Sequence, residues 1–352
     1  MQPIAVALLA AVLASQSMTA DSAGAQIVSE EVTFVAAGRT IPGTLVRPTS
    51  GTGPGVLLLA GSGPTDRDWN SPLLPGRNGS GRLMAEALAA RGVTVLRFDK
   101  AYSGRNPGLP IADLTLDTFR DEASAALDFL RSRAEVDPAR VFVAGHSEGG
   151  IHATRLAESR GDGIRGVILV SAPGRSMREL LEVQLATNVL GAANLTPAQV
   201  DAEMAPIRTA LRSFVAGQDV DPKTASSRPQ IVAILSALMA PPVARIGRAL
   251  ASFEPAQAAA GIAAPVLVMQ GAKDIQVDQV EDAERLVTAR RSGGKVVDYF
   301  PSPLADHVLK TEPRSLAELR ANPQLVQAGY NAPDRALADD LVEALAKWIR
   351  GH

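Results

Sequence analysis

Short apolar runs recur along this chain, and stretches with helical spacing separate them. Each run is about four to seven residues long, which suits a buried strand and is too short for a buried helix. Strands that are apolar on both faces are typical of a parallel sheet that helices cover on both sides. The strands predicted in this way are Gly55–Leu59, Gly92–Phe98, Val141–Ala144, Gly166–Ser171, Pro265–Gln270 and Lys295–Phe300.

The alternation of strands and helices predicts an α/β fold with a mostly parallel central sheet and helices on both faces. Two further strands, Val32–Val35 and Ile41–Arg47, are joined by a short turn and should form an antiparallel edge. Helices are predicted at Arg82–Ala90, Leu116–Arg133, Glu148–Ser159, Val280–Arg291 and Asp334–Arg350.

One region interrupts the alternation, because Arg175 to Ile262 contains helical segments and no strand pattern. We interpret residues 175–264 as a helical cap inserted into a core formed by residues 26–174 and 265–352. The cap is rich in Ala, Leu, Val and Met, so we expect it to form a largely apolar pocket. Its predicted helices are Met177–Val189, Pro197–Val215 and Pro229–Leu250.

The N-terminus resembles an export signal. Ile4–Leu13 is an apolar run with the length of a signal-peptide core, and Ala23-Gly24-Ala25 would permit cleavage before Gln26. No Lys or Arg precedes Arg39, so the usual positive start is missing; the alternatives are a short apolar helix or a wrongly chosen start residue. We expect residues 1–25 to be a cleaved signal peptide and the protein to be periplasmic or secreted. No later segment reaches the roughly 18 apolar residues of a membrane span.

Composition excludes several classes of function. The formal charge is −2, from 35 basic and 37 acidic residues, and no basic stripe indicates a nucleic-acid partner. The chain has no cysteine, which excludes disulfides, cysteine nucleophiles and thiolate metal sites. No cluster of His, Asp and Glu has metal-ligand spacing, and no GxxxxGK[ST] phosphate loop is present.

The stretch VFVAGHSEGG, Val141 to Gly150, has a serine between glycines where a strand meets a helix. Ligands of an open parallel sheet bind beyond the carboxyl ends of its strands, which is where Ser147 is predicted to lie. Gly145 and Gly149 remove the Cβ atoms that would collide in so sharp a turn. We therefore predict that Ser147 is a nucleophile; the alternative is a tight strand-to-helix connection in an inactive relative.

A serine nucleophile needs a base, and the chain contains four histidines. His307 follows the last predicted strand, in a loop that can return over the serine. His146 lies beside Ser147 and its ring must diverge from it, whereas His152 should pack on the following helix. His352 is the last residue and should be frayed. We predict that His307 is the base; the alternative is a solvated loop histidine.

The base needs a carboxylate that orients its ring and stabilises its charged form. Asp274, in QGAKDIQV, ends the strand before the one that precedes His307. Nucleophile, acid and base then follow one another in the order associated with the G-x-S-x-G turn. Asp278 is the nearest rival, and Asp306 is too close in sequence to orient His307. Asp274 could alternatively cap the helix that begins near Val280.

The oxyanion that forms on the substrate needs two backbone donors. We predict the amide of Glu148, directly after the nucleophile, and a second amide in the loop after Gly55–Leu59. Ser62 is the first choice for the second donor and Gly63 the next. The Glu148 side chain need not act chemically, since acidic residues are favoured in a first helical turn.

Through GHSEG, the turn at Gly271–Val277 and the Asp306-His307 pair, the chain resembles serine esterases of the α/β-hydrolase fold. GSGPTDRD and RFDK, Gly61–Asp68 and Arg97–Lys100, are similar to bacterial carboxylesterases that carry a GSGPxDRD segment. The resemblance implies hydrolysis of small-molecule carboxylic esters without a metal or organic cofactor. After RFDK this chain continues as AYSGRN, where that group often has Arg and Gly, and this departure would alter the pocket wall.

Four charged residues allow two interpretations. They could line the mouth of the site or hold the oxyanion loop in shape, or they could form a local ion-pair network that only braces loops; we favour the network. These residues are Asp66, Arg67, Asp68 and Asp99.

The same acyl-enzyme chemistry would also serve an amidase, a peptidase or an acyl transferase. A non-catalytic binding protein of this fold is the alternative from a different class. A complete set of nucleophile, acid and base in the correct order argues against it.

Overall fold

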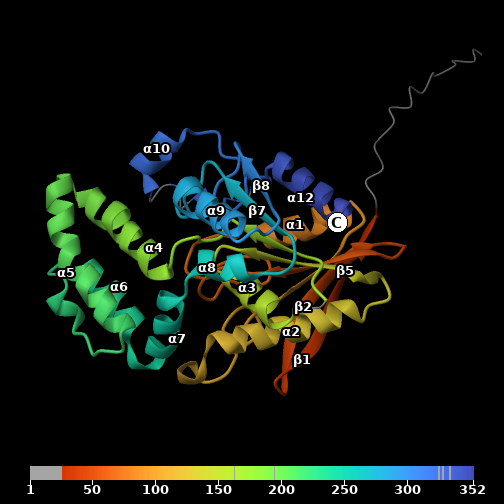
Figure 1. The fold of residues 1–352 in the computed structure, drawn as a ribbon, viewed down its shortest axis with the longest axis horizontal. Helices are drawn as coiled ribbons and strands as arrows, with labels where there is room; N and C mark the ends of the chain where they lie inside the picture. Colours follow the sequence, from red (N-terminus) through yellow and green to blue (C-terminus); the bar gives the residue numbers. More distant parts are fainter. Residues whose placement is uncertain (1–25, 162, 194, 324–325, 327–328, 333) are drawn as a thin grey trace, which may run out of the picture.

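The computed structural model describes residues 26–352 apart from positions 162, 194, 324–325, 327–328 and 333, so the predicted signal peptide at residues 1–25 lies outside the described part. Its centre is an eight-stranded sheet in the order β1-β2-β4-β3-β5-β6-β7-β8 (Figure 1). β1 and β2 pair antiparallel, as do β2 and β4, and the other neighbours are parallel. The strands are β1 Ile27–Ala36, β2 Arg39–Pro48, β3 Gly53–Leu59, β4 Thr94–Phe98, β5 Val136–His146, β6 Gly166–Val170, β7 Val266–Gly271 and β8 Val297–Ser302. The predicted α/β fold class is confirmed.

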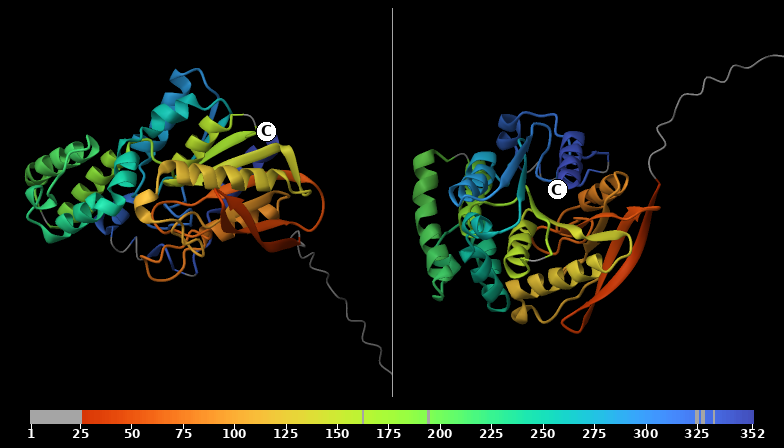
Figure 2. Two further views of the ribbon diagram at one scale, coloured as in Figure 1. Left: turned by 90° about the horizontal axis from the view of Figure 1, so that it is seen from below. Right: turned by 45° about the vertical axis from the view of Figure 1, so that its right-hand side comes forward.

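Helices cover both faces of the sheet (Figure 2), and a hydrophobic core lies between the helices and the sheet on each face. Successive residues of β3 alternate between them: Leu57 and Leu59 pack under α2 (Leu116–Arg131), whereas Val56 and Leu58 pack under α1 (Ser80–Ala89). A strand with both faces covered must be apolar throughout, which explains the continuous runs in the sequence. The other covering helices are α3 Gly149–Ser159, α8 Pro255–Gly261, α9 Arg285–Ser292 and α12 Asp339–Gly351.

A helical segment joins β6 to β7 and extends beyond the sheet (Figure 1). Residues of this segment form a small core of their own, which includes Met204, Leu211 and Leu235. Its last helix, α8, instead contributes Ala259 to the core under the sheet. The helices before α8 are α4 Met177–Gln184, α5 Pro197–Val215, α6 Pro229–Met239 and α7 Pro241–Ser252.

Four predicted helices differ from those observed. The predicted helix Met177–Val189 is α-helical only to Gln184 and continues as a π-helix, Leu185–Leu190. The predicted helix Pro229–Leu250 is broken at Ala240 into α6 and α7, which meet at an angle of 91°. Ala240 has ψ 135°, because the proline that follows disfavours the helical conformation of the residue before it. The last helix begins at Asp339 and not at Asp334, and a π-helical turn, Gln279–Glu284, precedes α9. Among the described residues no single helix meets the length and composition of a membrane span; α6 and α7 do so only together.

Arg290 fastens the chain where it returns from the helical segment to the sheet. The side chain is fully buried, and its guanidinium donates to the carbonyls of Ala259, Ile262, Ala264 and Val296. The first three acceptors lie at the end of α8 and before β7, and the fourth lies before β8. One side chain therefore satisfies backbone carbonyls of two connections in the interior, that from α8 to β7 and that from α9 to β8.

We expect Arg290→Met to lower the free energy of unfolding by about 3 kcal/mol, because several buried carbonyls lose their donors at once. Arg291→Met is the matched control, since the neighbouring side chain is exposed and forms no hydrogen bond or ion pair with a described residue. Urea denaturation measures both. Equal stability of the two variants would contradict this role of Arg290.

Candidate active site

The turn between β5 and α3, residues 145–149, brings two backbone segments into close contact. Ser147 has φ 54°, an unusual value for a non-glycine residue. A Cβ atom on Gly145 would lie 2.1 Å from the carbonyl oxygen of Gly149, and one on Gly149 would lie 2.4 Å from that of Leu59. The Ser147 amide donates to Val170 on β6 at 3.0 Å. Glycine is therefore required on both sides of a serine that is held at the end of the strand.

His307 and Asp274 form a buried pair. The distance between His307 Nδ1 and Asp274 Oδ2 is 2.8 Å. Asp274 follows β7, and His307 lies in the loop after β8. Asp274 Oδ1 accepts from the amides of Gln276 and Val277, and Oδ2 also accepts from the side chain of Gln270. Four donors thus hold the carboxylate in one orientation toward the imidazole.

The rival carboxylates are engaged elsewhere. Asp278 caps the π-helical turn by accepting from the amides of Val280 and Glu281, and it pairs with Arg320 at 2.8 Å. Asp274 therefore does not cap this turn. Asp306 accepts from two amides of its own loop and pairs with Arg335 at 2.7 Å. Asp306 thus shapes the loop that carries His307.

The pKa values of the two neighbouring histidines are shifted in opposite directions. Burial alone would lower the pKa of His307, but the charge and hydrogen bond of Asp274 raise it above its usual 6.5. Burial, followed by repulsion from His307, lowers the pKa of His146 to about 3. His146 stacks on Trp69, and its neutral ring donates from Nε2 to the carbonyl of His307 at 2.7 Å. The sequence indicated only that this ring must point away from Ser147.

On the other side of Ser147, the Glu148 side chain contacts the loop after β3. Burial by itself raises the pKa of Glu148, but hydrogen bonds from His152 and Ser62 and the charge of Lys100 lower it below its usual value. The carboxylate is therefore ionised, and it accepts from the Ser62 hydroxyl. Although we expected no chemical role for this side chain, it ties the loop of Ser62 to the start of α3.

Lys100 completes this contact. It is 6% exposed, and its ammonium donates to the carbonyl of Gly63. Burial lowers the pKa of Lys100, whereas the charges of Glu148 and Glu122 raise it. A buried cation is tolerated here because two carboxylates and a carbonyl compensate it. The sequence singled out the RFDK segment, Arg97–Lys100, but it could not predict a role for Lys100, because the partners of Lys100 lie on distant segments.

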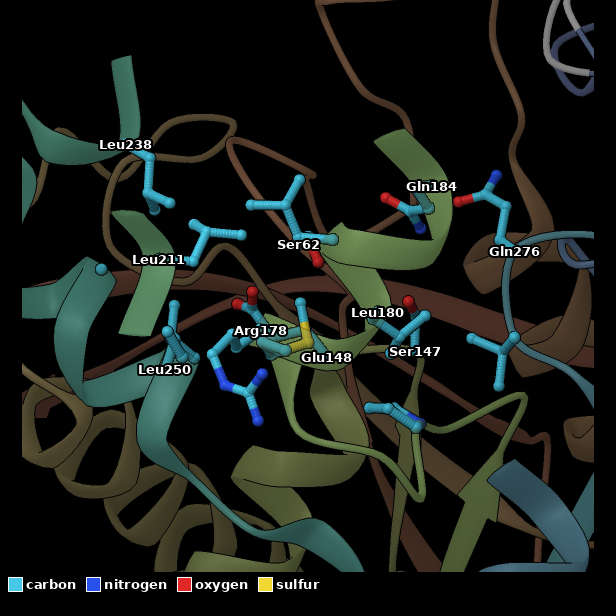
Figure 3. Close-up of a pocket in the computed structure, with 16 residues that line it drawn as sticks. Ser62, Ser147, Glu148, Arg178, Leu180, Gln184, Leu211, Leu238, Leu250 and Gln276 are labelled. Carbon is cyan, nitrogen blue, oxygen red and sulfur yellow. The ribbon is translucent and has the colours of Figure 1, made fainter. Parts of the chain in front are cut away.

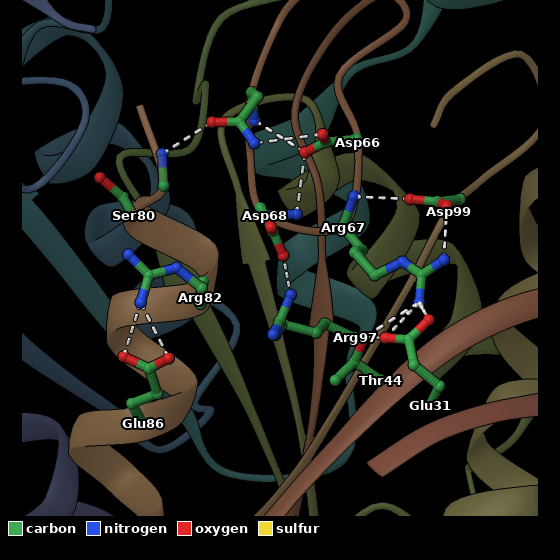
Figure 4. Close-up of polar contacts among 12 residues, drawn as sticks. Glu31, Thr44, Asp66, Arg67, Asp68, Ser80, Arg82, Glu86, Arg97 and Asp99 are labelled. Atoms are coloured by element: carbon green, nitrogen blue, oxygen red, sulfur yellow. Dashed lines mark hydrogen bonds and ion pairs between the residues drawn. The ribbon is translucent and has the colours of Figure 1, made fainter. Parts of the chain in front are cut away.

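Asp66, Arg67, Asp68 and Asp99, the four charged residues for which the sequence left two interpretations, form two separate sets of contacts (Figure 4). The Asp99 carboxylate accepts two hydrogen bonds from Arg67, one from the Arg67 backbone amide at 2.9 Å and one from the Arg67 guanidinium at 2.8 Å. Asp66 accepts from the amides of Asp68 and Asn70 within the same loop, and Asp68 pairs with Arg97 on β4. Arg67 and Asp99 thus satisfy each other, whereas Asp66 is satisfied within its own loop and Asp68 by Arg97. Both sets of contacts brace the loop after β3.

Two cavities meet at Ser147. The larger, about 360 Å³, extends from Ser62, Ser147 and Glu148 to the helical segment (Figure 3). Its apolar wall consists of Met177, Leu180, Leu181, Leu211, Leu238 and Leu250. The smaller, about 180 Å³, is lined by Ser147, His307, Trp69 and several polar side chains, among them Asn78 and Tyr330. Ser147 and His307 therefore face one space, although they lie on different loops.

No group of three potential metal ligands lies together in the described part of the chain.

A sequence profile described as serine aminopeptidase, S33, matches residues 79–313. The chain belongs to this family of α/β hydrolases. Esterase EstD of Thermotoga maritima is 33% identical to this S33 chain over 147 residues, which are 41% of the chain and 33% of the esterase. The S33 chain thus matches about a third of that curated relative's length.

Solved structures share the fold at low sequence identity. An esterase of Pyrococcus furiosus superposes with a TM-score of 0.51 and 15% identity, covering 86% of the S33 chain and 88% of its own. A proline iminopeptidase of Mycobacterium smegmatis gives a TM-score of 0.51 and 18% identity, covering 92% and 98%. These matches confirm the resemblance to the α/β-hydrolase fold; they do not test the closer resemblance through GSGPxDRD.

We expect Asp274→Asn to lower the pKa of His307, because burial then loses the charge and hydrogen bond of Asp274 that oppose it and only the weaker effect of Asp306 remains. Folding raises this pKa in the wild type. The protonated imidazolium therefore stabilises the fold below the unfolded pKa, and this contribution is lost as the pH rises through the folded pKa.

NMR titration of the histidine side chains measures this shift. Asp278→Asn is the control and should leave the pKa of His307 unchanged, since Asp278 caps the π-helical turn and pairs with Arg320 without contacting His307. An unchanged His307 pKa in Asp274→Asn would contradict the pairing.

Proposed function

We propose that the protein is a serine hydrolase that cleaves carboxylic esters through an acyl-enzyme. Ser147 is the nucleophile, His307 the general base and Asp274 the residue that orients His307. The observation that carries the proposal is the 2.8 Å contact between His307 and Asp274 beside a cavity that His307 shares with Ser147.

In the proposed reaction, the Ser147 hydroxyl attacks the ester carbonyl and its proton passes to Nε2 of His307. Asp274, bound at Nδ1, stabilises the resulting imidazolium. The amides of Glu148 and Ser62 hold the oxyanion of the tetrahedral intermediate. Collapse breaks the bond to the alcohol, which leaves with the proton from His307. Water then attacks the acyl-enzyme by the same route and releases the acid.

The contacts of Glu148 give a physical reason for the second oxyanion donor. An amide contributes most when it is fixed before the reaction, because reorganisation then costs nothing at the transition state. The hydrogen bond between Ser62 and Glu148, and that from Lys100 to Gly63, fasten the loop from both sides. We infer that the Glu148 carboxylate is a positioning group for this donor.

The larger cavity supports an apolar acyl group. Five leucines and a methionine form much of its wall, and its volume of about 360 Å³ suits acyl chains of small to medium length. We propose that α4–α7 act as a cap that sets this acyl specificity. The leaving alcohol would then occupy the smaller, more polar cavity next to His307.

An aminopeptidase is the second candidate, because the family description names that activity. A free α-amino group would need an uncompensated carboxylate near Ser147. Among the described residues that line the two cavities, Glu148 is the only carboxylate, and Lys100 and His152 compensate it. This balance favours a neutral ester over a peptide with a free amine. Amide hydrolysis and acyl transfer by the same catalytic residues are alternatives, and the comparison of esters with anilides below tests amide hydrolysis.

We also propose that the protein is exported and that residues 1–25 are removed. The apolar run Ile4–Leu13 and the Ala23-Gly24-Ala25 site support this proposal. N-terminal sequencing of the protein from a periplasmic or culture fraction should begin at Gln26. Recovery of the uncleaved chain from the cytoplasm would contradict export.

We expect p-nitrophenyl esters to be hydrolysed with a rate that rises with acyl length and then falls, and the matching anilides to react at least 100-fold more slowly. Leu211→Trp, which narrows the larger cavity, should move the optimum to shorter acyl chains, whereas the exposed Leu73→Trp should not. Faster anilide hydrolysis would favour an amidase. Hydrolysis that is unchanged in Ser147→Ala would contradict the assigned nucleophile.

A further inference from the structure

A cationic cavity of about 440 Å³ is lined in part by the loop between β3 and α1, residues 60–79, which we call the braced loop. Its wall combines Asp68 and Asn70 of that loop, the turn before α1, the first turns of α1, Lys310 and residues 334–336. Four basic side chains line it: Arg77, Arg82, Lys310 and Arg335. No step of the proposed hydrolysis uses this cavity.

Lys310 distinguishes the cavity from an ordinary basic surface. The residue is 1% exposed, yet its ammonium forms no ion pair or hydrogen bond with any described residue. Burial lowers the pKa of Lys310, and the positive charge of Arg335 lowers it further. Asp306 raises this pKa, and Arg82 lowers it more weakly than Arg335 does. A buried ammonium beside two guanidinium groups is costly unless an anion compensates it.

The other charged residues of the wall do not supply an anionic partner for Lys310. Arg82 pairs with Glu86, and Asp68 pairs with Arg97 (Figure 4). Arg335 pairs with Asp306, and Arg77 is exposed and has no carboxylate partner among the described residues. The remaining carboxylate, Asp334, is exposed at the rim.

The start of α1 adds to the positive potential. The helix begins at Ser80, has no acidic residue in its first turn, and its Gly79, Arg82 and Leu83 line the cavity. The first amides of α1 already have acceptors, since Gly79 donates to Asn70 Oδ1, Ser80 to Asn78 Oδ1 and Gly81 to the carbonyl of Asp68. The helix therefore contributes the positive end of its dipole, which favours an anion at such a point.

We propose that this cavity binds an oxyanion, a phosphate or a carboxylate, through the side chains of Lys310, Arg77 and Arg82. Asn78 lines both this cavity and the smaller cavity at His307. The oxyanion is therefore either a free anion bound next to the active site or the anionic end of an alcohol that leaves from it.

Binding of inorganic phosphate to the wild-type protein tests the proposal without any need for hydrolysis. Millimolar phosphate should raise the melting temperature by a few degrees above sodium chloride of equal ionic strength. Calorimetry should give an affinity at least fivefold weaker for Lys310→Met and for Arg77→Gln. Lys223→Met, an exposed lysine of the helical segment, is the control and should bind phosphate as the wild type does.

Two results would overturn the site: no phosphate-specific shift in the wild type, or undiminished affinity in both variants. Arg77 is exposed, so Arg77→Gln should fold normally and decides the question if Lys310→Met does not fold. Because binding is measured directly, a failure here differs from a failure of the proposed hydrolysis.

A second measurement assigns the source of the anion and rests on the proposed esterase activity. The substrates are two esters of one acid, one with a neutral alcohol and one whose alcohol carries a carboxylate. If the anion belongs to the leaving group, phosphate raises the KM of the anionic ester alone, and Lys310→Met removes that effect. A free anion would act on both esters alike.

Discussion

The close contact of backbones at the turn between β5 and α3 determines where the reactive groups can lie. Gly145 and Gly149 allow the start of α3 to pack directly against the backbone of β5 and β3, and Gly150 leaves room for the side chain of Ala172 in the loop after β6. Ser147 is held at a positive φ as a result. Every other group of the site is arranged around this fixed point, since β5 has β3 and then β4 on one side and β6, β7 and β8 on the other.

Polar contacts then fix the two loops that face Ser147. On the side of β3, Asp99 and Arg67 hold the braced loop, and Lys100 and Glu148 hold its first residues. On the side of β8, neutral His146 and the buried Asp306 support the loop that presents His307. Each of these groups is buried and paired, so the loops are rigid although they have little regular structure.

Much of this arrangement follows from local sequence. The strands could be predicted because sheets covered on both faces demand continuous apolar runs, and Gly145 and Gly149 marked the turn. The choice between Asp274 and Asp278 depended on three-dimensional contacts, because both follow β7 and only the fold shows which one caps a helix. The terminal His352 was expected to be frayed, and this prediction was wrong: its ring packs 4.3 Å from that of Trp348.

The roles of Glu148 and Lys100 could not be derived from the sequence. The pairing of their charges depends on the sheet order, which brings β4 and β5 to either side of β3. The sequence could not predict the unpaired state of Lys310 for the same reason, since the residues that share its cavity come from α1 and from residues 334–336. Spacing along the chain reports periodicity and turns, whereas compensation of buried charge is a property of the assembled fold.

The most direct test of the account is covalent labelling of the intact protein with a fluorophosphonate, followed by mass spectrometry of its peptides. We expect a single adduct on Ser147, its loss in Ser147→Ala, and labelling slowed by at least 100-fold in His307→Ala, which removes the base. An unlabelled wild-type protein, or an adduct on another residue, would contradict the assignment of Ser147 as the nucleophile.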